Sequence, residues 1–308
     1  MIDIVNVTKH YGSIQALRDV SFHAPRGSIL GLLGQNGAGK TTLLNIITGY
    51  LAPSSGHVLL GGYDPLMQPA MAKRHLGYLP EHPPLYDEMT VCEYLSFVAE
   101  LRGVKKHAIS AHVSEIMELT GLLDMRSRLL SNLSKGYRQR AGIAQTLCGD
   151  PDVLVLDEPT VGLDPKQITE IRNLIKTLSK DRTIIFSSHI LSEIQQLCNH
   201  VVILHNGSVK LDVPMSDVYD SREMTLLCTL GTAQTQIAQK LRELEGIRRV
   251  TPQSSARPNE SAYTLTFYDE PDPERKLFAL LSGLDIPILH LSRCEDTLEQ
   301  VFLRVVSE

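Results

Sequence analysis

The chain lacks any apolar run long enough to cross a membrane. Its 308 residues are 43% hydrophobic and 21% charged, an ordinary mixture for a globular protein, but no apolar stretch approaches the roughly 20 residues that span a bilayer. The N-terminus, Met1 to Lys9, also lacks the basic and then apolar segments of a secretory signal. If the protein works at a membrane, we expect another chain to supply the spanning helices.

Cysteine pairs and a strong net charge are also missing. The five cysteines are scattered without any C-x-x-C pair, which argues against a metal ribbon or a disulfide framework and fits a reducing cytosol. The formal net charge is −5, so no overall field draws the molecule to nucleic acid or to acidic lipid. We therefore expect a cytoplasmic protein without a nucleic-acid partner.

Short apolar runs alternate with helical patterns in the first two thirds of the chain. Strands buried on both faces of a parallel sheet have such nearly continuous Ile, Leu, Val and Phe. The runs lie at Ser28–Leu33, Val153–Asp157, Thr183–Ser188 and Val201–Leu204. The opening segment, Met1 to Val7, mixes apolar and polar positions and suits an outer antiparallel strand. An α/β fold with a parallel sheet and an antiparallel edge sheet is predicted.

Between Tyr86 and Leu133 the pattern is purely helical. Thr90 and Glu93 form a capping box, in which each side chain satisfies an exposed N–H group of the other, and an apolar helix pattern follows. The sequence predicts a helical subdomain at residues 85–140, inserted into a first domain at residues 1–215.

The composition turns to Gly, Ser, Pro and Asp from Asn206 to Glu223, which predicts a linker. A small C-terminal α+β domain of the ferredoxin-like kind, residues 222–308, is predicted beyond it from the order βαββαβ. A last helix, Asp296–Val306, is expected to pack one face inward. The other expected elements are strands Met224–Leu230, Ile247–Pro252, Ala262–Tyr268 and Ile286–Leu291, and helices Ala233–Leu244 and Pro273–Leu281.

A glycine-rich loop with the spacing G-x-x-x-x-G-K-[ST] follows the run Ser28–Leu33. Its glycines let backbone N–H groups curl around phosphate oxygens, and the helix after it points its positive end at the same anion. Lys40 would bridge the β- and γ-phosphates, and the Thr41 hydroxyl would ligate Mg²⁺. The candidate phosphate-binding residues are Gly34, Gln35, Asn36, Gly37, Ala38, Gly39, Lys40, Thr41 and Thr42.

Two acids end the apolar run Val153–Asp157. A buried strand places Asp157 at its carboxyl end, where α/β sheets bind ligands. Asp157 would hold Mg²⁺ through water, and Glu158 would polarise the attacking water. Without the phosphate loop, a pair of solvated acids at the end of a strand would be the simpler interpretation.

A second anion site is predicted at Ser134 and Gly136, which present a hydroxyl and N–H groups at a helix start. Alone, Ser134 would more often be a simple helix cap. One ATP molecule does not obviously reach both this site and Lys40 within one domain, so two subunits that clamp the nucleotide between them would explain the duplication.

In this order, these motifs resemble the ABC ATPases over residues 1–215. The resemblance rests on Gly34–Thr42, Leu133–Arg140, Val153–Glu158, Gly162-Leu163-Asp164 and Ser187-Ser188-His189. It implies that Tyr11 stacks on adenine, that His189 contacts the γ-phosphate, and that Asp164 lies in the loop crossing a dimer interface. Alone, His189 would be assigned to the core or the surface.

The resemblance also implies ATP hydrolysis by a head-to-tail pair of subunits, expected to be a homodimer, that drives a separate transmembrane permease. The expected cofactors are ATP and Mg²⁺, and the expected location is peripheral, on the inner face of the cell membrane. Glu81 occupies the segment that joins the γ-phosphate to the permease, where the family usually has Gln. Lys135-Gly136-Tyr137 follows Ser134 where the family usually has Gly-Gly-Gln. Both departures are most similar to the gliding-motility-type export ATPases, which implies export.

Other P-loop classes fit less well. A GTPase would need an N-K-x-D guanine motif, which is absent, and a chromosome-handling ATPase would need long heptad repeats between Lys40 and Ser134. The remaining alternative is a non-transport ABC ATPase that acts as a regulatory interaction switch. Co-purification with a polytopic membrane protein separates the two.

Overall fold

The computed structural model describes residues 1–218, 223–229, 234–253, 257, 259–268, 272–294 and 297–307. They form two compact units, one of Met1–Met215 with Arg304–Glu308 and one of Ser216–Leu303. The assignment of 1–215 and 222–308 as functional domains stays a prediction. No helix of the described ranges is both long and apolar enough to cross a bilayer.

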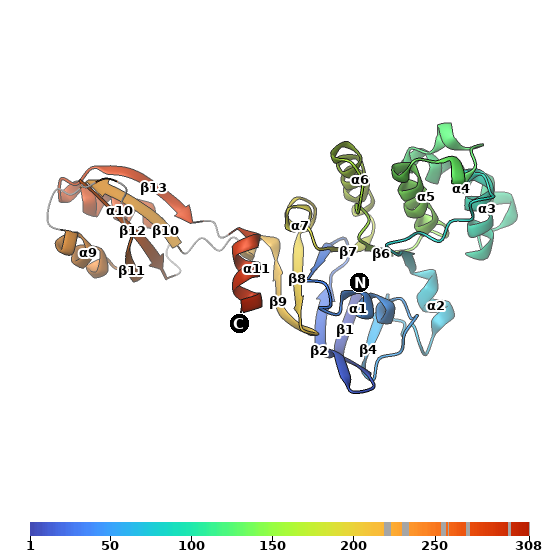
Figure 1. The fold of residues 1–308 in the computed structure, drawn as a ribbon, viewed down its shortest axis with the longest axis horizontal. Helices are drawn as coiled ribbons and strands as arrows, with labels where there is room; N and C mark the ends of the chain where they lie inside the picture. The colour runs from blue at the N-terminus through green and yellow to red at the C-terminus, as the bar shows by residue number, and fades with distance from the viewer. Residues whose placement is uncertain are drawn as a thin grey trace. The chain divides into compact units, whose positions relative to one another are not determined.

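A six-stranded sheet forms the centre of the first unit (Figure 1). Its order is β5-β6-β7-β3-β8-β9, and every neighbouring pair except the last is parallel. The predicted buried strands are confirmed, because every residue of β3, β6 and β7 is buried. The strands are β3 (Ile29–Leu33), β5 (Leu76–Leu79), β6 (Val153–Asp157), β7 (Thr183–Ser188), β8 (His200–His205) and β9 (Ser208–Pro214).

The linker predicted from Asn206 to Glu223 is wrong over most of its length. Strand β9 pairs antiparallel with β8, and a short helix α8 (Met215–Val218) follows it. Alternate residues of β9 are exposed, as expected for an edge strand with one wet face. This exposure explains why its composition looks like that of a loop. Residues 219–222 lie outside the described part of the chain.

A three-stranded antiparallel sheet of order β2-β1-β4 completes the unit. It contains β1 (Ile2–Tyr11), β2 (Ile14–Ala24) and β4 (Ser55–Leu60). The antiparallel pairing of the opening segment is confirmed, but its outer position is wrong, because β1 pairs on both sides. Apolar residues of this sheet, of the six-stranded sheet and of α1 (Lys40–Ile47) share one core. The helix that follows the phosphate loop therefore packs against both sheets.

The expected helices pack on one another between β5 and β6 in the chain (Figure 1, green). Thr90 and Glu93 form the predicted capping box at the start of α3. Two later helices each follow a strand of the six-stranded sheet: Pro165–Leu178 follows β6, and Leu191–Leu197 follows β7. The helices are α2 (Pro69–Arg74), α3 (Val91–Leu101), α4 (Lys106–Thr120), α5 (Lys135–Leu147), α6 (Pro165–Leu178) and α7 (Leu191–Leu197), with 3₁₀ turns at Leu123–Met125 and Leu130–Asn132.

The second unit has the predicted order βαββαβ. Its antiparallel sheet runs β11-β12-β10-β13, and Leu226, Tyr263 and Leu277 are fully buried in its own core. The elements are β10 (Glu223–Thr229), α9 (Gln234–Glu243), β11 (Ile247–Gln253), β12 (Glu260–Phe267), α10 (Pro273–Gly283) and β13 (Ile288–Cys294).

The last helix, α11 (Leu298–Ser307), shows the predicted amphipathic pattern. Leu298 is fully buried, whereas Leu303 on the opposite side is exposed. Asp296, where this helix was expected to begin, lies outside the described residues.

Candidate functional site

The sheet topology brings the predicted chemistry to one edge. Strand β7 lies between β3 and β6, and all three are parallel. The segments that follow these strands therefore leave the sheet at the same carboxyl edge. They carry the phosphate loop after β3, Glu158 after β6 and His189 after β7.

Two glycines shape the phosphate loop for different reasons. Gly34 leaves β3 so close to β8 that an added Cβ would lie 2.5 Å from the Leu204 carbonyl oxygen. Gly39 has a φ of 105° directly before α1, a region that side chains disfavour. The tip of the loop, residues 35–37, is exposed, whereas Ala38 is buried. The loop is thus anchored at both ends and open to solvent between them.

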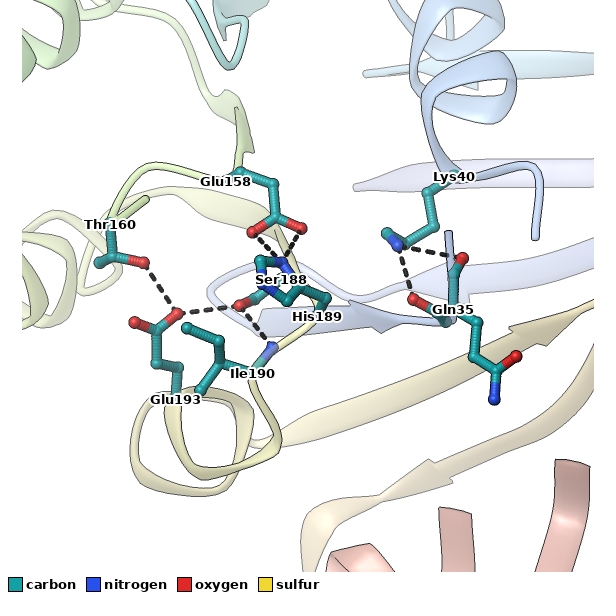
Figure 2. A network of polar contacts seen from close by, with 9 residues as sticks. Gln35, Lys40, Glu158, Thr160, Ser188, His189, Ile190 and Glu193 are labelled. Carbon is teal, nitrogen blue, oxygen red and sulfur yellow. Dashed lines mark hydrogen bonds and ion pairs between the residues drawn. The ribbon is translucent and has the colours of Figure 1, made fainter. Parts of the chain in front are cut away.

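Lys40, the first residue of α1, points its ammonium group toward this loop (Figure 2). Its side chain is only 8% exposed, and Nζ donates to the carbonyl oxygens of Gly34 at 2.5 Å and Gln35 at 3.4 Å. Burial lowers the pKa of Lys40, while the charges of Glu158 and Asp157 raise it. An ammonium group beside an exposed glycine-rich loop suits a polyanion such as triphosphate, whereas the two nearby carboxylates favour a cation that would offset their repulsion of it.

Asp157 ends β6 with a carboxylate that is 5% exposed. Burial raises its pKa, the Ser187 hydroxyl lowers it, Glu158 and Glu81 raise it further, and Lys40 lowers it. A desolvated carboxylate in this surrounding gains from a hard cation, which prefers oxygen ligands. With the exposed Thr41 hydroxyl in the first turn of α1, the donor set fits Mg²⁺ held jointly with phosphate oxygens.

Glu158 and His189 face each other at this edge (Figure 2). The His189 Nδ1 atom lies 2.9 Å from both carboxylate oxygens of Glu158. The backbone of Glu158 has a φ of 48°, and its N–H donates to the Ser187 carbonyl oxygen at 3.1 Å. The Glu158 side chain is 12% exposed and that of His189 49% exposed, so solvent reaches a carboxylate that is already oriented.

Glu81 follows β5, the next strand along the sheet. It is exposed and close enough to Asp157 to raise the pKa of that carboxyl. Glu81, Lys135 and Arg138 line one cavity of about 310 Å³. Glu81 and Lys135, two of the positions that depart from the family's usual residues, therefore lie around the same space.

Ser134 and Asp164 each cap a helix. The Ser134 hydroxyl accepts from the Tyr137 N–H at the start of α5, and Asp164 forms a capping box with Gln167 at the start of α6. An added Cβ on Gly136 would lie 2.7 Å from Cδ of Gln167, so these two helix starts lie side by side. Within the described ranges, no hydrogen bond or ion pair links Ser134, Gly136 or Asp164 to Lys40.

Tyr11 ends β1 beside the turn into β2. Its side chain is 49% exposed, and the Lys9 ammonium group lies 5.4 Å from its ring centroid. The Ala16 carbonyl of the same hairpin lies 2.9 Å from the Cβ position of Gly39. An accessible aromatic ring therefore stands on a hairpin that contacts the phosphate loop.

Sequence reasoning assigned no role to Thr160, Ser187 or Glu193. Ser187 lies beside Asp157, and Glu193 accepts hydrogen bonds from Thr160 and Ser188. The sequence does contain a sign that Glu193 is buried, because this acid occupies one position of an apolar stripe with the helical spacing i, i+3, i+4, i+7. The stripe contains Ile190, Glu193, Ile194 and Leu197.

Comparison with known proteins points to one family. The family described as ABC transporter matches residues 17–161. The ABC transporter ATP-binding protein NatA of Bacillus subtilis is 40% identical over 68% of this chain and 85% of its own length. The bacitracin transport ATP-binding protein BcrA of Bacillus licheniformis is 33% identical over 99% of this chain and 97% of its own.

A solved structure described as the ATP-binding subunit of an ABC transporter has 30% sequence identity and a TM-score of 0.65, covering 71% of this chain and 91% of that one. The ABC ATPase fold predicted from the motifs is therefore confirmed. With the phosphate loop, the buried acid and the Glu158–His189 pair at one sheet edge, these likenesses show that the chain belongs to the ATP-binding, ATP-hydrolysing subunits of ABC transporters.

Proposed function

We propose that this chain hydrolyses ATP between two copies of itself to drive export through a separate permease. The convergence of Lys40, Asp157, Glu158 and His189 on one sheet edge is the observation that carries the proposal. In this proposal, the 34–42 loop and Lys40 bind the triphosphate, and Tyr11 stacks on the adenine. Thr41 and Asp157, with Glu81 nearby, would hold Mg²⁺, which when bound neutralises charge on the phosphate oxygens.

The proposed reaction is an in-line displacement. A water oxygen forms a bond to the γ-phosphorus while the bond from that phosphorus to the β–γ bridging oxygen breaks, which yields ADP and phosphate. Glu158 accepts a proton from the attacking water, and His189 holds the γ-phosphate. The His189–Glu158 contact already orients the carboxylate, which lowers the entropic part of the barrier.

A second copy completes the proposed site. Ser134 and Gly136 stand at the start of α5, a helix of 13 residues whose positive end suits an anion. Among the described residues, no hydrogen bond or ion pair joins Ser134 or Gly136 to Lys40. In this proposal, the start of α5 therefore binds the phosphate of a nucleotide that is held by the Lys40 loop of the other copy. Asp164, at the adjacent start of α6, would then lie at the interface.

The permease is proposed to dock on a cavity of about 1190 Å³ between α2, α3 and the end of α5. Its lining includes Tyr50, which is 84% exposed, and the basic side chains Lys73 and Arg74. Tyr78 also lines it and belongs to β5, the strand that leads to Glu81. A permease segment with an acidic side chain would fit this surface and could transmit its motion to the nucleotide.

The export direction and the gliding-motility subgroup rest on sequence likeness at Glu81 and at Lys135-Gly136-Tyr137. The likeness to the bacitracin transport protein over nearly the whole chain supports a role in transport. We infer a peripheral location on the inner face of the cell membrane. Co-purification of the tagged protein with a polytopic membrane protein would support transport, and its absence would favour the regulatory alternative.

Glu158→Gln tests the reaction. We expect phosphate release to fall at least about a hundredfold, because the amide does not accept the water proton, while ATP binding is retained. Glu118→Gln, at an exposed position on α4, is the matched control and should behave as wild type. Phosphate release at the wild-type rate by Glu158→Gln would refute the proposed base.

A further inference from the structure

A buried carboxylate connects two loops of the proposed site from behind. Glu193, in the first turn of α7, is 3% exposed. Its Oε2 atom accepts from the Thr160 hydroxyl at 2.8 Å and from the Ser188 hydroxyl at 2.9 Å (Figure 2). The two donors are themselves 2% and 0% exposed, so water does not compete for these bonds.

Each donor is a near neighbour of a residue that faces the reaction. Thr160 stands two positions after Glu158, and Ser188 directly precedes His189. The Ser188 hydroxyl also accepts from the Ile190 N–H at 3.1 Å, which directs its own proton to Glu193. One carboxylate oxygen of Glu193 thus connects the segment after β6 to the end of β7 by two hydrogen bonds.

The Glu158 backbone requires such support. Its φ of 48° lies in the left-handed region, which a residue with a side chain keeps only where its surroundings hold it. The hydrogen bond from the Glu158 N–H to Ser187 holds one side of this residue, and the Thr160–Glu193 bond holds the other. The His189–Glu158 contact adds less, because His189 is 49% exposed and solvent screens it.

We propose that Glu193 is a positioning residue for ATP hydrolysis. By accepting hydrogen bonds from Thr160 and Ser188, it holds Glu158 and His189 in their positions relative to each other. The inference rests on the roles proposed above for Glu158 and His189. Glu193 touches neither of them and acts through the two hydroxyls. Loosening this link should misplace the attacking water while leaving the phosphate loop, and hence ATP binding, intact.

Thr160→Val is the main test, since it removes the hydroxyl and keeps the shape. We expect kcat to fall roughly 10- to 100-fold, as misplacement at a reacting centre does, with the KM for ATP within about twofold of wild type. Thr120→Val is the control, because Thr120 is fully buried and its hydroxyl bonds the Ile116 carbonyl at 2.7 Å within α4. It should lose comparable stability in urea and keep its kcat.

Glu193→Gln supplies a second reading. Its amide oxygen still accepts a hydrogen bond, so kcat should lie between those of wild type and Thr160→Val. In a double-mutant cycle on kcat, Thr160→Val should cost less in the Glu193→Gln background than in wild type, because the shared link is already weakened. Rates are expressed per nucleotide-binding site, so that a smaller fraction of folded protein is not mistaken for a lower kcat.

The outcomes are distinguishable. A wild-type kcat in Thr160→Val, or fully additive losses in the cycle, would overturn the positioning role even where stability falls. Glu158→Gln is measured in parallel. If it releases phosphate normally, the proposed base fails; if it is inactive while Thr160→Val and Glu193→Gln are fully active, only the role of Glu193 fails.

Discussion

At the residue scale, the site concentrates charge that the protein alone does not neutralise. Asp157 and Lys40 are both nearly inaccessible to solvent. Burial raises the pKa of Asp157 and lowers the pKa of Lys40, so that it favours the neutral form of both side chains. Functional sites commonly sacrifice stability in this way. Binding a nucleotide with its cation would relieve both residues, so ligand and fold stability are linked here.

Asp157→Asn should therefore stabilise the nucleotide-free protein at neutral pH while abolishing ATP hydrolysis. Because the folded pKa of Asp157 is raised above its ordinary value of 3.8, the folded state binds this proton more tightly than the unfolded state. The contribution of Asp157 to stability is then greatest below pH 3.8 and is lost as the pH rises through the folded pKa. The advantage of the variant should grow over the same interval.

Urea unfolding of wild type and variant between pH 4 and pH 8 measures this difference. Asp181→Asn changes an exposed carboxylate and is the control, for which we expect less than about 0.5 kcal/mol at any pH. An Asp157→Asn advantage that shrinks toward pH 8 would contradict the assigned burial.

At the element scale, continuous apolar patterns were predictable and edge positions were not. The runs that became β3, β6 and β7 are buried at every residue, so each position in them carries the signal. Strand β9 has one wet face and was mistaken for a linker. The middle position of β1 depends on two partners, β2 and β4, which alternation along one strand does not reveal.

The same distinction holds in the site. Residues that act through a local motif, such as Lys40 in its glycine loop, are recognisable from spacing alone. The Glu193–Thr160 bond joins residues 33 positions apart, and only the fold brings them together. The one local sign of it, an acid within the apolar stripe of α7, indicates burial but names no partner.

The contribution of the capping box at α3 to the free energy of unfolding is measurable. Thr90 Oγ1 accepts from the Glu93 N–H, and the Glu93 carboxylate accepts from the Thr90 N–H at 2.8 Å. Thr90→Ala should lower the free energy of unfolding by about 1 kcal/mol, the usual loss for a cap, without changing the KM for ATP. Ser110→Ala, within the exposed part of α4, should cost less than about 0.5 kcal/mol. Equal losses in both variants would deny the cap its role.

At the scale of the whole molecule, the described residues divide into two units that each bury their own core. All the residues proposed for ATP binding belong to the first unit. Within it the phosphate loop before α1 is separate from the helix starts at Ser134 and Asp164, and no hydrogen bond or ion pair of the described residues joins Lys40 to Ser134, Gly136 or Asp164. If the proposed function is right, a single chain carries two halves of different sites, which is the arrangement expected of a head-to-tail pair.

Glu158→Gln with Mg-ATP should accordingly form a stable dimer of the 34.2 kDa chain, because hydrolysis no longer opens the interface. Adding Ser134→Glu should weaken that dimer at least about a hundredfold, since like charges brought together at an interface cost several kcal/mol and the new carboxylate would face the partner's triphosphate. Ser110→Glu adds the same charge at an exposed residue of α4 and should leave the dimer intact. Light scattering over a concentration series gives each dissociation constant. If Ser134→Glu dimerises as tightly as Ser110→Glu, the start of α5 does not meet the partner's nucleotide, and the proposed head-to-tail arrangement is wrong even if both variants bind ATP.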